Sequence, residues 1–200
     1  IISYCVWLYY TFPLSFRDIE KMMLYRGITV TYESIRGWCL KFAQGYANQL
    51  RKQRPKPGDK WHLDEVVIKI KGEQFYLWRA VDQHGVVLDI LMQRRRNTAA
   101  AYRFFRKLLK STGFAPRVII TDKLKSYGAA KKEILKGVEH RQHEGLNNRA
   151  ENSHRPTRIR ERWMGRFKSV GHARRLLAAV DPMRGHFRPQ QHEQTASGYR

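Results

Sequence analysis

Apolar residues recur at helical spacing through the first quarter of the chain. They predict one short helix that ends near Thr11, and a second that follows Ser15, a candidate N-cap, and stops at Gly27. A third helix begins after Thr31, another candidate cap, with polar and basic side chains left outward. Helix, tight turn and helix is the helix-turn-helix pattern, so we expect a DNA-binding domain over residues 1–52. A small helical interaction module would show the same spacing.

If the helix-turn-helix reading holds, side chains early in the third helix are placed to reach base edges or phosphates. These are Tyr32, Glu33, Ser34 and Arg36. Residues 53–60 are basic and rich in proline and glycine, without apolar periodicity, and are predicted to form a linker.

The pattern changes from helical to strand-like after residue 60. The expected elements are three strands joined by short turns (61–72, 74–83, 86–93), a helix (97–111) capped by Asn97, a strand (117–122), a helix (124–136), a strand (138–143), and helices from Asn147 and over 171–180. This order predicts an α/β fold with a mixed sheet and flanking helices. We expect this core to occupy residues 61–188 and the polar residues 189–200 to form a tail.

The formal net charge of +22, from 39 Lys and Arg against 17 Asp and Glu, points to a partner. Repulsion of this size opposes compaction unless a polyanion screens it, so nucleic acid is expected. A ribosomal-type structural protein or a membrane-surface binder would show a similar balance. Two cysteines without a CxxC pair imply neither a disulfide framework nor a cysteine-based zinc site, and favour a reducing cytoplasm. The longest apolar run near the start, "YCVWLYY", is too short to span a bilayer.

Two aspartates stand out because carboxylates are scarce in this chain. Asp64 lies in a predicted strand, where alternation sends Glu65 to the opposite face, so only one of the two can join a given site. Asp122 ends an apolar strand, at the edge where α/β sheets usually place their chemistry. For each, a structural role as a cap or in a salt bridge with Lys69 or Lys123 stays open.

Glu151 is the one carboxylate in "NNRAENSHRPTR", residues 147–158. His154 and Arg155 follow at three and four residues, so one helical face would carry all three, and Pro156 is expected to kink or end that helix. The alternative is a surface Glu151–Arg155 pair worth about 0.2–0.5 kcal/mol. Three oxygen ligands without cysteine suit Mg²⁺ or Mn²⁺ better than zinc, and two such ions suit in-line attack on phosphorus.

Several ordered strings carry a resemblance over nearly the whole chain: "WHLDEVVIKIKG", "YLWRAVDQHGVVLDILMQRRRN", "ITDKLKSYGAA" and "VEHRQHEGLNNRAENSHRPTRIRER". They resemble bacterial insertion-sequence transposases of the DDE type, closest to the IS-six family. The resemblance implies an RNase H-like, retroviral-integrase-like core behind the helix-turn-helix. It assigns catalysis and metal binding to Asp64 in "HLDE", Asp122 in "TDK" and Glu151 in "NNRAEN". It also implies that the strands bearing the first two acids are neighbours and that a helix brings the third alongside.

The function implied is DNA strand cleavage and strand transfer at element ends, with two Mg²⁺ or Mn²⁺ ions. The expected partners are double-stranded DNA, as terminal inverted repeats and as target, and further copies of the chain, in a homodimer or larger assembly at the bacterial nucleoid. The side chains expected to orient phosphates are Lys123, Asn148, Arg149, His154, Arg155 and Arg158.

The chain departs from the family where Trp163 and Gly165 replace polar or basic residues, and its start is expected to be truncated. An inactive copy that only binds DNA is therefore one alternative. An RNase H-like nuclease without transposition is another.

Overall fold

The structure is a computed structural model that describes residues 1–54 and 56–186. The described chain forms two compact units, one made of residues 1–54 with 178–186 and the other of residues 56–177. The expected end of the core, residue 188, stays a prediction. By its contacts the second unit ends at Leu177, and the residues that follow bond within the first unit, where Arg51 donates to the Ala178 carbonyl and Arg184 Nη1 donates to the Thr11 carbonyl (3.1 Å). The expected tail, 189–200, lies outside the described residues.

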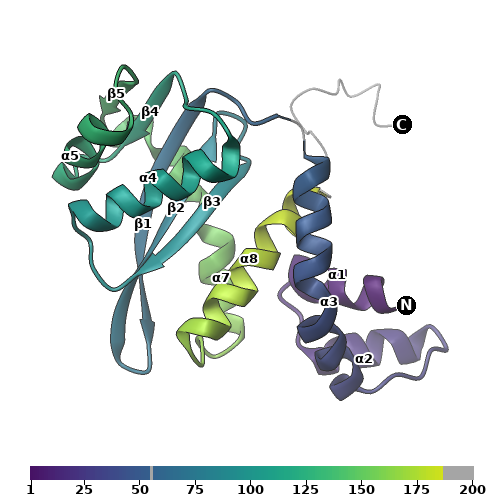
Figure 1. Ribbon diagram of the computed structural model, residues 1–200. Helices are drawn as coiled ribbons and strands as arrows, with labels where there is room; N and C mark the ends of the chain where they lie inside the picture. Colours follow the sequence, from purple (N-terminus) through teal and green to yellow (C-terminus); the bar gives the residue numbers. More distant parts are fainter. Residues whose placement is uncertain (55, 187–200) are drawn as a thin grey trace. The chain divides into compact units, whose positions relative to one another are not determined.

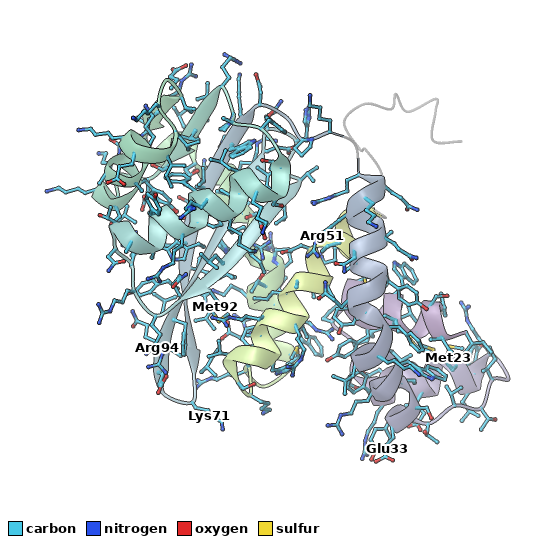
Figure 2. The ribbon with its side chains drawn as sticks, in the orientation of Figure 1. Met23, Glu33, Arg51, Lys71, Met92 and Arg94 are labelled. Atoms are coloured by element: carbon cyan, nitrogen blue, oxygen red, sulfur yellow. The ribbon has the colours of Figure 1, made fainter. Side chains whose placement is uncertain are left out.

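The first unit contains α1 (Ile2–Thr11), α2 (Phe16–Tyr25) and α3 (Tyr32–Gln53). The predicted caps are confirmed: Ser15 Oγ accepts from the Asp18 N–H (3.1 Å), and Thr31 Oγ1 accepts from the Ser34 N–H (3.2 Å). Gly27 follows α2 with φ +73°, a left-handed conformation that suits glycine at a helix end. The interior of the unit is apolar and includes Cys5, Ile19, Ile35 and Met23, which Figure 2 labels.

A mixed sheet forms the centre of the second unit. Its strands are β1 (Lys60–Ile70), β2 (Glu73–Asp82), β3 (Val87–Gln93), β4 (Val118–Thr121) and β5 (Glu139–Gln142). In the described chain their order is β3-β2-β1-β4-β5; β1 to β3 form an antiparallel meander, and β4 is parallel to both β1 and β5. The predicted α/β class and mixed sheet are confirmed.

One face of the sheet is covered by α4 (Thr98–Thr112) and α5 (Lys125–Ile134). Figure 1 shows α4 lying across the strands. Trp61 and Leu63 of β1 and Trp78 of β2 pack with Phe104 of α4 and Tyr127 of α5 in a single hydrophobic cluster. Alternate residues of β1 therefore point toward these helices, and the residues between them point to the opposite face.

On the opposite face lie the short helix η1 (Glu144–Leu146), α6 (Asn148–Ser153) and α7 (Arg155–Trp163), and α8 (Val170–His186) follows them. The helix predicted from Asn147 is interrupted at His154, and Pro156 lies in the first turn of α7, where a proline costs no helical hydrogen bond. Helix α8 is longer than the predicted span 171–180 and contains Pro182. Within the described residues no helix is both long and apolar enough to cross a membrane.

Candidate active site

Asp64 lies in β1 and Asp122 directly follows the neighbouring strand β4, as we expected. β1 and β4 run parallel with His62 opposite Ile120, and each acid stands two residues beyond that pair. In a parallel ladder this places the two acids at the same level.

Asp64 and Glu65 point to opposite faces, as strand alternation predicts. The Asp64 carboxylate lies 3.5 Å from His154 Nε2. Glu65 instead accepts a hydrogen bond from the Tyr127 hydroxyl (2.6 Å) and one from the Arg96 guanidinium. Of this adjacent pair, only Asp64 belongs to the face on which α6 lies.

Two buried polar side chains hold α6 against β1. Asn147, 1% exposed, donates from Nδ2 to the Leu63 carbonyl (2.8 Å). His154, 3% exposed, lies against Asp64. Glu151 stands four residues after Asn147 and three before His154, and so shares their side of the helix. It is exposed, so α6 presents it at the solvent edge of the face that carries Asp64.

The charges of Asp122 and Glu151 act on Asp64. The pKa of Asp64 is raised to about 7, first by burial, then by the charge of Glu65, and further by the charges of Asp122 and Glu151. The pKa of His154 is lowered to about 3, by burial and then by the positive charges of Arg79 and Arg158. His154 is therefore neutral at pH 7, and its contact with Asp64 is a polar contact rather than an ion pair.

Asp122 forms a salt bridge, one of the structural roles that the sequence left open. Its Oδ1 accepts from the Leu124 N–H (3.0 Å) at the start of α5, and its Oδ2 accepts from Arg96 Nη2 (3.0 Å). The cation beside it is thus Arg96, not Lys123. Within residues 1–54 and 56–186, no three His, Cys, Asp or Glu side chains converge closely enough to hold one ion. The three acids are neighbours rather than a closed ligand set.

Comparison with known proteins identifies the chain. Residues 58–190 match a family profile described as a DDE domain. The chain is 32% identical over 186 residues to the transposase for insertion sequence-like element IS431mec of Staphylococcus aureus, which covers 90% of this chain and 81% of the relative. Identity and coverage are the same for the transposase for insertion sequence element IS257 in transposon Tn4003, also from Staphylococcus aureus. The chain belongs to the DDE transposases.

Among solved structures, the catalytic domain of the Mos1 mariner transposase aligns with a TM-score of 0.49 and 15% identity, covering 74% of this chain and 87% of that one. The family relationship confirms the resemblance read from the motifs and the polynucleotidyl transferase class of this transposase.

The side chains predicted to contact DNA fall in both units of the transposase. In the second unit Lys123, Asn148, Arg149, Arg155 and Arg158 are exposed. The buried ring of His154 differs from them, which argues against direct contact with a phosphate. In the part of the chain that is described, no ion pair joins Glu151 to Arg155, so the alternative role of Glu151 as a surface partner gains no support.

In the first unit, Glu33, Ser34 and Arg36 are exposed in the first turns of α3, and Figure 2 labels Glu33 at that end of the helix. Tyr32 is half-buried: its N–H donates to Glu20 Oε1 (2.9 Å) and its ring lies under the Arg17 guanidinium (4.9 Å). The exposed members of this group remain accessible to a partner.

Sequence reasoning missed two arginines. Arg79, 1% exposed, lies directly opposite Asp64 in the β1–β2 ladder and donates from Nη2 to Thr157 Oγ1 (2.8 Å). An arginine inside the apolar run "YLWRAVD" was a usable signal for it. Arg96 joins Glu65 to Asp122, but nothing in "QRRRN" sets it apart from its neighbours.

Proposed function

We propose that this transposase cleaves DNA strands and transfers them at the ends of an insertion sequence, with Asp64, Asp122 and Glu151 as its catalytic acids. The packing of three separate elements carries the assignment: Asp64 and Asp122 stand at the same level of the β1–β4 pair, and Asn147 and His154 hold α6, which bears Glu151, against β1. The charges of Asp122 and Glu151 also help to raise the pKa of Asp64. A buried carboxylate close to other carboxylates is costly in a protein, and such perturbed groups are typical of functional sites.

The donor set fits divalent cations. Carboxylate oxygens are the ligands preferred by Mg²⁺ and Mn²⁺, and a cation would relieve the repulsion that now raises the pKa of Asp64. Asp64, Asp122 and Glu151 would hold two such ions. When bound, the ions supply the activation of a water or a 3′-hydroxyl and the stabilisation of the leaving oxygen in an in-line attack on phosphorus.

The chain's own residues prepare this site in two ways. His154 and Asn147 fix the first and third acids relative to each other, because both side chains join α6 to β1. Exposed cationic and amide groups close to the acids in sequence are suited to orient the phosphates of the DNA. These are Lys123, Asn148, Arg149, Arg155 and Arg158.

Recognition of the element's inverted repeats belongs, in this proposal, to residues 1–52, through Tyr32, Glu33, Ser34 and Arg36. Residues 53–60 serve as the linker to the catalytic core. The net charge of +22 supports a double-stranded DNA partner. Because two DNA ends have to be joined, the working form is a homodimer or larger assembly, which acts at the nucleoid in the bacterial cytoplasm.

The test replaces Asp122 with Asn and measures nicking of a labelled element end with Mn²⁺, together with DNA affinity. We expect Asp122→Asn to abolish nicking and to change the affinity less than about twofold, since the carboxylate contributes no favourable charge to DNA binding. Asp59→Asn, which removes a half-exposed aspartate paired with Arg117, is the matched control and should nick normally. Normal nicking by Asp122→Asn would refute the assignment. Binding without nicking by the unmodified chain would support the inactive copy.

A further inference from the structure

Arg96 links two carboxylates from different strands. It precedes Asn97, the N-cap of α4, and its Nε donates to the Glu65 carboxylate while its Nη2 donates to Asp122 Oδ2 (3.0 Å). Its side chain is 39% exposed, that of Asp122 is 32% exposed, and that of Glu65 is 1% exposed. The guanidinium therefore has one buried anchor and one partner at the solvent edge of the site.

The buried anchor is rigid. Glu65 also accepts from the Tyr127 hydroxyl (2.6 Å), and the Tyr127 ring is fully buried against Trp78 and Phe105, with ring centroids 5.3 and 6.0 Å away. A carboxylate held by a core tyrosine cannot follow its arginine outward. Arg96 is thus held in place through Nε while Nη2 remains on Asp122.

The fixed position of Arg96 affects Asp122. Both of its oxygens are engaged, Oδ1 by the Leu124 N–H and Oδ2 by Arg96. Arginine keeps its positive charge at every accessible pH. A divalent cation approaching Asp122 would meet that fixed positive charge within a few ångströms and be repelled by it.

We propose that Arg96 is an internal counter-cation for Asp122, a positioning residue that holds this carboxylate while the site is free of metal and opposes the binding of divalent cations there. The inference rests on the proposed role of Asp122 as a metal ligand. In the transposase without DNA, Arg96 keeps the affinity of the acids for metal low.

The experiment titrates Mn²⁺ into the full chain without DNA, by calorimetry, and needs no catalytic activity. Arg96→Gln removes the charge and should bind Mn²⁺ about tenfold more tightly than the unmodified chain. Arg96→Met is a second neutral variant that should show the same gain in Mn²⁺ affinity. It takes the place of Arg96→Gln if that variant folds poorly. Arg96→Lys keeps the charge without the two-pronged geometry and should stay within about twofold of the unmodified chain.

The matched control is Arg94→Gln, which removes a neighbouring arginine (labelled in Figure 2) whose exposed ion pair with Glu73 spans 2.7 Å. It should leave Mn²⁺ affinity unchanged. Unchanged or weaker binding by both neutral Arg96 variants would overturn the inference, as would a tenfold gain in Arg96→Lys. If Asp122→Asn left the Mn²⁺ affinity of the otherwise unmodified chain unchanged, the proposed metal site itself would fail.

Discussion

Replacing Asp64 with Asn should stabilise the metal-free protein at alkaline pH. The carboxyl has a pKa of about 7 in the folded chain against an ordinary value of 3.8. Folding thus favours its protonated form, and this stabilising contribution is fully present below pH 3.8 and lost as pH rises through 7. At about 1.36 kcal/mol per pKa unit, the difference between these two pKa values corresponds to about 4 kcal/mol in the free energy of unfolding.

Because the Asp64 side chain is 14% exposed and its neighbours relax, we expect Asp64→Asn to raise the free energy of unfolding by somewhat less than this, about 2–4 kcal/mol at pH 8. Asn has the size of Asp without the charge, so Asp64→Asn avoids the cost of ionisation. The free energy of unfolding is measured by urea titration in EDTA from pH 4 to pH 8, with tryptophan fluorescence as the signal. The gain of the variant over the unmodified chain should grow with pH.

Asp59→Asn is the control, because the hydrogen bond from Arg117 lowers the pKa of Asp59 and its removal should not stabilise the protein at pH 8. The reasoning fails if Asp64→Asn is no more stable than the unmodified chain at pH 8. It fails equally if the gain is the same at pH 5 and pH 8, since a contribution independent of pH cannot come from ionisation.

Two further substitutions separate catalysis from DNA binding. His154→Ala removes a buried ring that contacts Asp64, so nicking should fall at least tenfold. DNA affinity, measured by gel shift, should stay within about twofold. If His154→Ala lost as much DNA affinity as Arg158→Ala does, His154 would instead be a phosphate contact. Arg36→Ala removes an exposed charge from α3, so the slope of log affinity against log salt should become shallower by about one, and an unchanged slope would exclude Arg36 from the DNA interface.

Local signals made much of the fold predictable. Ser15, Thr31 and Asn97 cap helices by accepting hydrogen bonds from backbone N–H groups three residues away, so a few adjacent residues determine their roles. The alternation of β1 likewise sends Asp64 and Glu65 to opposite faces without reference to the rest of the chain. Such features depend on the backbone nearby, and a pattern along the chain is enough to predict them.

Features that depend on distant contacts were not predictable in this way. We expected His154 to contact phosphate, but its ring is buried against β1. Neither its spacing from Glu151 nor the position of Pro156 reveals this burial. Arg96 stands in a run of three arginines, and only the path from β3 into α4 turns this one toward Glu65. Both side chains acquire their partners when elements far apart in sequence pack together.

Nicking of a labelled element end with Mn²⁺, compared between the unmodified chain and Glu151→Gln, tests the central claim most directly. The control is Glu133→Gln, which neutralises an exposed glutamate on α5. The account predicts that Glu151→Gln binds the DNA end as well as the unmodified chain does but produces no nicked product, while Glu133→Gln nicks normally. Normal nicking by Glu151→Gln would show that Glu151 is not the third acid of this site.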